Sequence, residues 1–478
     1  MEMLSCHLNR DTDLPLYEQL YIYIKNEITE GRLEYGSKLP SKRKLADFLN
    51  ISQNTVETAY DQLIAEGYVE SLPRKGYFVM ASGDLEYVQA ADVPPNHELH
   101  EEKQSTIRYN FHPSWVDTEN FPFAQWRKYA KNTIDKQNHS LLLLGDAQGE
   151  FALRQEISNY LYHARGMQCS PEAIIVGAGV EVLLQQLLLL FNKDTIYGVE
   201  DPGYHLISRI LKSFPNDVYP LEVDDEGIQV EPIEKANPDV VYVTPSHHFP
   251  YGTVLSVNRR TQLLNWAAEQ ESRYIIEDDY DSEFRYTGKS IPSLKSMDQA
   301  GKVIYLGSFS KSLIPSLRIS YMVLPKPLLK RYKRELAFYH SSVSRIDQHI
   351  LAQFMKEGDF ERHLNRMRKI YRRKLEKISE LVKPYEETVS IIGERSGLHI
   401  VLSVNNGMCE DELVQKATAA GIKVYPLSGY SLGKNYENPP KIILGFAGVP
   451  EEELPTAITN LLEVWVPVTP RNLSKTEQ

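Results

Sequence analysis

From Tyr109 onward, helical stretches alternate with short apolar runs that are typical of buried strands. A chain that places a helix between consecutive strands forms a mostly parallel sheet covered by helices on both faces. The strands are expected at Ala173–Val176, Thr195–Val199, Val240–Thr244, Tyr274–Ile276 and Val303–Leu306. Two further strand-like segments near the C-terminus, GLHIVLSV and KIILGF, predict a smaller α/β lobe. The pattern therefore predicts a large α/β domain with a small C-terminal lobe.

Residues 14–80 follow another pattern, three amphipathic helices and then a hairpin. We expect the helices at about Pro15–Glu30, after Ser41 and after Ser52, because serine is a good helix N-cap. The segment YVESLPRKGYFVM predicts a two-stranded wing. In the second helix, Leu45, Phe48 and Leu49 are expected to face inward. The sequence thus predicts an N-terminal all-α winged helix-turn-helix domain at 14–80, a linker at 81–104 with a Pro-Pro pair and clustered acids, and the large domain at 105–470.

The bulk composition excludes several classes of protein. A chain of 478 residues exceeds what one core usually supports. A net charge of −11 argues against nucleic-acid binding by the whole surface, so any DNA binding must come from a local basic surface. The three cysteines have no metal-ligand spacing, so no metal site is expected. No secretion signal or membrane span is evident, and we expect a cytoplasmic protein without membrane contact.

A local basic surface is found at the start of the expected second helix. Lys42, Arg43 and Lys44 occupy its first turn, where the helix dipole disfavours cations, and a docked DNA phosphate would stabilise them. A solvated basic turn is the alternative. The wing tip adds two cations, and the third helix offers polar side chains for reading bases. The expected DNA-binding residues are Ser41, Lys42, Arg43, Lys44, Ser52, Gln53, Asn54, Thr55, Arg74, Lys75 and Gly76.

The segment from Gly31 to Val79 resembles the winged-helix domain of the GntR family. The resemblance is carried by a PSxRxLA turn, an S-x-x-T-V-x-x-A-Y helix and a variant G-x-G wing tip. It implies a double-stranded DNA operator as a partner. Many relatives have arginine where this chain has Gln53, so the operator sequence is not implied.

A second group of motifs follows the expected strands of the large domain. Lys311 comes just after VIYLG, Asp278 and Tyr280 come after Tyr274–Ile276, and Gly177–Val180 joins a strand to a helix. Alone, they are best interpreted as a surface lysine, a solvated acidic loop and a tight turn. Together with Arg318 they supply what pyridoxal phosphate needs: a lysine, an acid for the pyridine nitrogen, a donor to the phenolic oxygen and a phosphate cradle.

In order and spacing these motifs resemble the fold-type I aminotransferases, and the whole chain resembles the MocR (GabR-like) regulators. The resemblance implies a pyridoxal 5'-phosphate cofactor, with Lys311 as its Schiff-base lysine. Asp278 is implied as the partner of the pyridine nitrogen, with Asp279 as the competing choice. His248, where a Gln or Asn is usual, either contacts the cofactor oxygen or only fills space. The implied cofactor-binding residues are Asp278, Tyr280, Tyr204, Gly179, Val180, Ser308, Ser310, Arg318 and His248.

One departure from the aminotransferases bears on function. Enzymes of this fold usually place an arginine near the C-terminus to bind the substrate carboxylate, whereas the matching strand here reads Lys441-Ile-Ile-Leu-Gly-Phe446. We therefore expect a homodimeric transcription regulator that senses an amine or amino acid through transaldimination at Lys311. The alternatives are an active aminotransferase with an autoregulatory DNA-binding domain, and a scaffold that binds no cofactor.

Overall fold

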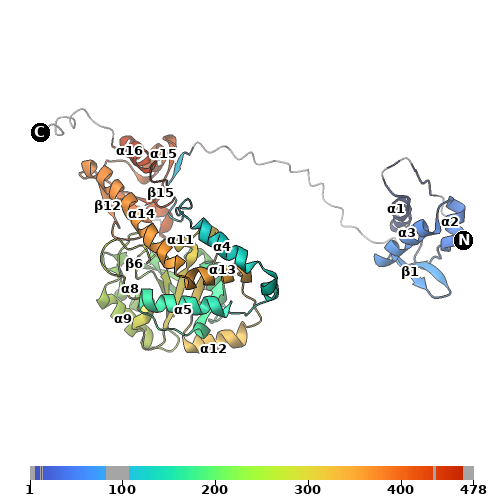
Figure 1. The fold of residues 1–478 in the computed structure, drawn as a ribbon, viewed down its shortest axis with the longest axis horizontal. Helices are drawn as coiled ribbons and strands as arrows, with labels where there is room; N and C mark the ends of the chain where they lie inside the picture. The colour runs from blue at the N-terminus through green and yellow to red at the C-terminus, as the bar shows by residue number, and fades with distance from the viewer. Residues whose placement is uncertain (1–5, 11, 13, 82–106, 434–437, 467–478) are drawn as a thin grey trace. The chain divides into compact units, whose positions relative to one another are not determined.

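The computed structural model describes residues 6–10, 12, 14–81, 107–433 and 438–466. Its residues divide into two compact units, 1–104 and 105–478, which we describe separately (Figure 1). Most of the expected linker, and the last residues of the expected large domain, lie outside the described residues.

The smaller unit is a three-helix cluster with a two-stranded wing. Its elements are α1 (Leu16–Thr29), α2 (Lys42–Leu49), α3 (Gln53–Ala65), β1 (Val69–Leu72) and β2 (Gly76–Val79). Its core is formed by one face of each helix, and the buried Tyr60 of α3 donates a hydrogen bond to the carbonyl of Pro40, just before α2 (2.9 Å). This bond fixes the turn that presents α2. Leu45 is buried as expected, but the prediction for Phe48 is wrong: it is 49% exposed and Ala46 is buried instead.

The larger unit is built around an eight-stranded sheet of order β4-β11-β10-β9-β8-β5-β6-β7. The central strands from β10 to β6 run parallel, whereas β4, β11 and β7 form antiparallel edges. The strands are β4 (Ile174–Gly177), β5 (Tyr197–Asp201), β6 (Val218–Asp224), β7 (Gly227–Ile228), β8 (Val240–Val243), β9 (Tyr274–Asp279), β10 (Val303–Ser308) and β11 (Ser320–Val323). A mostly parallel sheet was predicted and is confirmed.

Helices cover both faces of this sheet because successive strand residues point in opposite directions. On β8, Val240 and Tyr242 pack with α6, α7 and α12, whereas Val241 and Val243 pack with α8, α9 and α10. The helices of this unit are α4 (Phe123–Thr133), α5 (Phe151–Arg165), α6 (Val180–Leu188), α7 (His205–Lys212), α8 (Val230–Ala236), α9 (Val257–Ala268), α10 (Leu294–Met297), α11 (Phe309–Ser312), α12 (Lys326–Glu335), α13 (Arg345–Lys356) and α14 (Asp359–Val382).

The C-terminal lobe has a four-stranded antiparallel sheet of order β12-β13-β16-β15 and two helices. Its elements are β12 (Val389–Ile392), β13 (His399–Val404), α15 (Glu410–Ala419), β14 (Ile422–Lys423), β15 (Tyr425–Pro426), β16 (Lys441–Gly445) and α16 (Leu454–Trp465). The short strand β3 (Tyr109–Asn110) pairs with β14, so the start of the larger unit is anchored to its end. Figure 1 shows α14, α15 and α16 grouped at this end of the unit.

Candidate functional site

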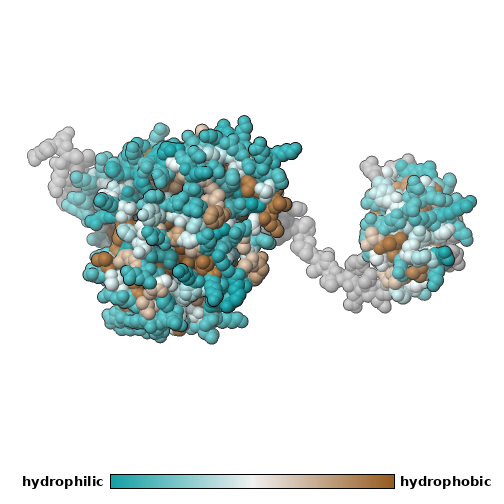
Figure 2. All heavy atoms as spheres, turned by 60° about the horizontal axis from the view of Figure 1, so that its bottom comes forward, coloured by the Kyte–Doolittle hydropathy of each residue, from teal (hydrophilic) through white to brown (hydrophobic). Residues whose placement is uncertain are grey.

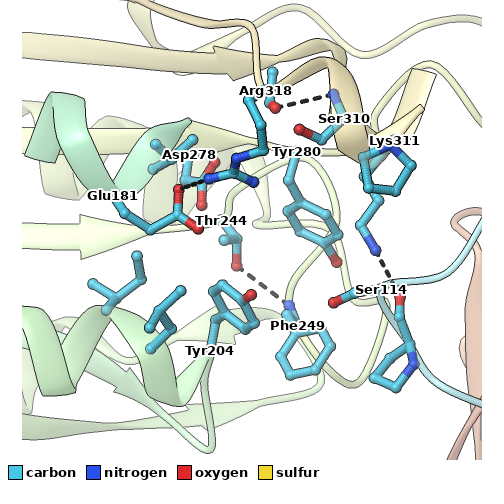
Figure 3. A pocket seen from close by; sticks show the side chains of 16 residues that line it. Ser114, Glu181, Tyr204, Thr244, Phe249, Asp278, Tyr280, Ser310, Lys311 and Arg318 are labelled. Atoms are coloured by element: carbon cyan, nitrogen blue, oxygen red, sulfur yellow. Dashed lines mark hydrogen bonds and ion pairs between the residues drawn. The ribbon is translucent and has the colours of Figure 1, made fainter. Parts of the chain in front are cut away.

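A cavity lies where β5, β8, β9 and β10 end, the edge at which parallel α/β sheets bind ligands. It is lined by the expected Schiff-base lysine, Lys311, and by seven of the nine expected cofactor-binding residues: Val180, Tyr204, Asp278, Tyr280, Ser308, Ser310 and Arg318. Figure 3 shows Asp278, Tyr280, Lys311 and Arg318 around a common space. Segments more than a hundred residues apart are therefore brought together by the strand order.

The two neighbouring acids of β9 have different surroundings. The Oδ2 of Asp278 accepts a hydrogen bond from the hydroxyl of Tyr242, while its buried Oδ1 has no partner among the described residues. Asp279 instead forms a buried ion pair with Arg165, 2.7 Å from Oδ2 to Nε, and accepts from Tyr305. Burial raises the pKa of Asp278 to about 7, so a cationic partner would be needed to hold it ionised. Asp278, not Asp279, faces the cavity.

The residues expected to hold a phosphate lie close together at the start of α6. Gly179 is the N-cap with φ of 97°, and a Cβ there would clash with Nη2 of Arg318. Arg318 Nη2 contacts Glu181 Oε2 at 2.7 Å, and the Ser308 hydroxyl accepts from the Ser310 N–H at 3.2 Å. Glycine at 179 thus leaves room for the guanidinium beside the free N–H groups of the helix.

Lys311 is held within the short helix α11, directly after β10. Its Nζ donates a hydrogen bond of 2.7 Å to the carbonyl of Pro113. Burial lowers the pKa of the Lys311 ammonium to about 8, since few opposite charges offset the loss of water. A larger neutral fraction near neutral pH is what a lysine needs to act as a nucleophile.

Tyr280 is connected to a buried polar pair. Its hydroxyl lies 3.0 Å from Nδ1 of His247, and the same nitrogen lies 2.8 Å from Oδ1 of Asp281. This arrangement fixes the Tyr280 ring at the cavity wall. His248 does not line the cavity: it is buried behind it, stacked on Tyr251 and 3.8 Å from Glu200. His248 therefore fills space in this structure, and its contact with the cofactor stays a prediction.

Several residues of the site were not expected from the sequence. Glu181, Thr244 and Phe249 line the cavity, and Tyr242 and His247 hold residues that do. Tyr242 carried a detectable signal, because a hydroxyl inside the otherwise apolar strand VVYV must find a buried partner. His247 and Phe249 lie in the loop that follows β8, where sequence alone does not indicate which side chains point inward.

The smaller unit presents the expected basic surface. Ser41 and Ser52 cap α2 and α3, accepting hydrogen bonds from the N–H groups of Lys44 (3.3 Å) and Thr55 (3.1 Å). The side chain of Arg43 is 83% exposed. Lys44, Gln53, Asn54, Arg74 and Lys75 are also exposed, and Arg74 and Gly76 turn the wing with φ of 63° and 110°.

Lys42 differs from its two neighbours. Its Nζ lies 2.5 Å from Oε1 of Glu57 on α3, and only a quarter of its side chain is exposed. Glu57 thus offsets part of the unfavourable interaction with the helix dipole. Arg43 and Lys44 remain the cations of this turn that face solvent.

Comparisons with known proteins agree with this two-part organisation. Residues 16–79 match the family of bacterial regulatory proteins, gntR family, and residues 115–461 match aminotransferase class I and II. The "Probable rhizopine catabolism regulatory protein MocR" of Rhizobium meliloti is 32% identical over 95% of this chain and 94% of its own. The chain belongs to the MocR-type GntR regulators.

Other relatives and structures extend this assignment. The "Uncharacterized HTH-type transcriptional regulator YdeL" of Bacillus subtilis (strain 168) is 48% identical over 96% of this chain and 98% of its own. Among solved structures, Pyrococcus horikoshii kynurenine aminotransferase has a TM-score of 0.67 at 23% identity, covering 76% of this chain and 91% of that one. The expected fold is therefore confirmed: a GntR winged helix and a fold-type I aminotransferase-like domain. No helix among the described residues is long and apolar enough to cross a membrane.

Proposed function

We propose that this MocR-type regulator binds pyridoxal 5'-phosphate at the cavity of its larger unit and senses an amine or amino acid there. The observation that carries the proposal is the buried, unpartnered Oδ1 of Asp278 in a cavity that also holds Lys311. An orphaned buried carboxylate oxygen is costly unless a ligand supplies its partner. The protonated pyridine nitrogen of the cofactor would supply a donor and a positive charge.

The other residues present fit the same group. Arg318, Ser308, Ser310 and the N–H groups at Gly179 and Val180 would hold its phosphate. Tyr280 would donate to its phenolic oxygen, and the ring of Tyr204 would stack on it. When bound, the cofactor supplies an aldehyde carbon at which one amine replaces another as imine partner, with no net oxidation or reduction.

Lys311 is the residue of this chain that such an exchange releases. Its neutral amine is available near neutral pH because burial lowers its pKa to about 8. Once released, its Nζ has a ready acceptor in the Pro113 carbonyl. The cavity therefore accommodates both the bound and the released lysine.

The exposed basic turn and wing support binding of a double-stranded DNA operator by the smaller unit. Arg43, Lys44, Arg74 and Lys75 would contact phosphates, and Gln53 and Asn54 would reach base edges. Ser41 and Ser52 would present the first turns of their helices to the backbone. A protein that acts on an operator works in the cytoplasm, and we place it there.

We further propose a homodimer, because two winged-helix domains related by symmetry would match the two half-sites of a symmetric DNA operator. Figure 2 shows apolar side chains at several places among hydrophilic ones on the visible side of the larger unit. Exposed large apolar residues of this unit include Leu142, Leu143, Leu144 and Phe338, each at least 68% exposed. Contiguous exposed apolar surface often marks an interface.

The second candidate is an active aminotransferase whose DNA-binding domain regulates its own operon. It is supported by the presence of Lys311, Asp278, Tyr280 and Arg318 in one cavity. A scaffold without cofactor is less consistent with the site, because such a protein needs neither a lysine in the cavity nor a buried Asp278 Oδ1 without a partner among the described residues.

One experiment separates these functions. The purified full-length protein should be yellow, and Lys311→Ala should lose the cofactor absorbance and the borohydride-reducible link to protein. Candidate amines, added with a keto-acid acceptor, should change operator binding without sustained product. Multiple turnover at about 1 s⁻¹ or faster, with operator binding unaffected, would instead support the aminotransferase. A colourless protein that takes up no pyridoxal phosphate would contradict both.

A further inference from the structure

The charges on the cavity wall bear on which ligand it accepts. Among the described residues that line it, the acids are Glu181 and Asp278 and the cations are Lys311 and Arg318. Under the proposed function, Arg318 binds phosphate and Lys311 binds the aldehyde carbon. Both cations are then engaged, and Arg318 already faces Glu181 at 2.7 Å. The described lining therefore offers no further positive charge to a ligand carboxylate.

The C-terminal lobe presents an apolar cluster next to this cavity. Ile443 of β16 is fully buried in a cluster with Phe249, Val401, Leu427 and Tyr430. Phe249 belongs both to this cluster and to the cavity wall. Figure 3 shows its ring among the side chains that line the cavity. The middle of the strand that closes this side of the site is thus apolar.

The residues that flank the middle of β16 supply no cation to the described cavity wall either. After the strand, a Cβ at Gly448 would lie 2.7 Å from Cβ of Trp115, so a side chain there would displace Trp115. At its start, Lys441 lies over the ring of Tyr251, 4.8 Å from the centroid, and does not line the cavity.

Three histidines lie close to the same wall. Burial lowers the pKa values of His248 and His399 to about 3, so both rings are neutral at physiological pH. Nδ1 of His247 faces the carboxylate of Asp281 at 2.8 Å, which offsets any charge on that ring. None of the three therefore substitutes for a guanidinium.

Most of the remaining wall is apolar. Val180, Ile207, Pro315 and Phe249 line it. Apart from Glu181 and the residues assigned to the cofactor, the polar side chains in the described lining are Ser114 and Thr244, whose hydroxyls carry no charge. Burying a carboxylate against such a wall without a partner is strongly unfavourable, whereas an alkyl or aryl group is stabilised there.

We propose that the effector of this site is a primary amine that carries no carboxylate and has an apolar alkyl or aryl tail. The inference rests on the proposed function, because it assumes that the amine meets the cofactor at Lys311. It excludes the amino acids that the broader proposal leaves open. The tail would lie against Phe249 and Ile207.

The test uses pairs of ligands that differ only by a carboxylate: phenethylamine and phenylalanine, tyramine and tyrosine, propylamine and 4-aminobutyrate. Each is titrated into the full-length, cofactor-loaded protein, following visible absorbance and, separately, operator binding. We expect each amine to bind at least tenfold more tightly than its partner. An amino acid that binds as tightly as its amine would overturn the inference while leaving the sensor function intact.

The other outcomes separate the two proposals. One such outcome is that amines change the absorbance at lower concentrations than the matching amino acids and yet never affect operator binding. That result would support an amine without a carboxylate as the ligand of the cavity and refute the sensor function. No absorbance change with any ligand would refute both. Phe249→Arg should narrow or reverse the preference, and Phe249→Leu, its matched control, should retain it. An arginine variant that holds cofactor and keeps the wild-type preference would contradict the placement of the tail.

Discussion

Asp279→Asn tests whether the two acids of β9 have separate tasks. Asp279 and Arg165 form an ion pair of 2.7 Å, with both side chains 3% exposed. An arginine does not lose its proton in a protein, so removing the carboxylate charge leaves a buried, uncompensated cation. Breaking such a pair costs about 3–5 kcal/mol. We expect about 3 kcal/mol, the low end, because asparagine still accepts a hydrogen bond and Glu277 lies near enough to interact with Arg165.

The measurement is urea unfolding of the cofactor-free protein at one protein concentration. If unfolding exposes surface with a slope of about 3 kcal/mol per M, the midpoint falls by about 1 M. Only midpoints measured with the same probe are compared, because two units need not unfold together.

Asp278→Asn is the matched control. Burial already raises the pKa of Asp278 to about 7, so near neutrality a neutral side chain changes the charge little, and asparagine keeps an acceptor for Tyr242. We expect a midpoint close to wild type but a cofactor affinity reduced tenfold or more, followed by visible absorbance. The reasoning is refuted if Asp279→Asn unfolds like wild type and loses the cofactor, or if Asp278→Asn is the destabilised variant.

Three further predictions concern other groups of the molecule. The rate at which cofactor-free protein captures pyridoxal phosphate should rise with pH and level off above about 8, because the Lys311 ammonium loses its proton in this range. Stopped-flow absorbance at several pH values measures this rate, and a rate that does not change with pH would contradict the prediction. Burial raises the pKa of Glu200 from 4.5 to about 8, so the folded state keeps a proton that the unfolded state loses, and stability falls as pH rises from about 5 to 8. Glu200→Gln should make that fall shallower by up to about 1.4 kcal/mol per pH unit in urea titrations, and an unchanged slope would exclude Glu200 as a cause. Arg43→Ala should weaken operator binding by about 1–3 kcal/mol or reduce its salt dependence. Lys42→Met should have a smaller effect on operator binding, because Lys42 is paired with Glu57. Equal effects of the two variants in a fluorescence binding assay would contradict this distinction.

The sequence was informative wherever local pattern decides structure. The three N-terminal helices and four of the five parallel strands, β5, β8, β9 and β10, could be placed because apolar periodicity and serine caps act within a few residues. β6 and β11 were not expected. β6 lies near the edge of the sheet and has a single buried residue, Leu221, so it lacks an apolar run, and β11 is a short antiparallel strand formed by residues just after the lysine motif. Phe48 was misplaced because Ala46 and Phe48 point to opposite sides of Leu45 on the helix, and only the tertiary packing decides which of these sides is buried with Leu45.

The site could be predicted in part for a related reason. Lys311, Asp278 and Tyr280 each follow a strand, so the parallel order places them at one edge. The choice between Asp278 and Asp279 depends on Arg165, which reaches the acid from α5, more than a hundred residues earlier. The apolar cluster around Ile443 likewise draws residues from the loop after β8, from β13 and from the C-terminal turn. Such long-range contacts have no signature in a local stretch of sequence.

The hydrogen bond between Lys311 and Pro113 connects the cavity to the first described segment of the larger unit. Pro113 follows β3, which pairs with β14, and the preceding N–H of Arg108 donates to the carbonyl of Gly421 at 2.7 Å. Under the proposed function, Lys311 would lose this bond while it held the cofactor and would regain it when an amine replaced it. A ligand shifts a conformational equilibrium only through contacts that differ between the states. The bond to Pro113 would be such a difference, located in the segment where the larger unit begins.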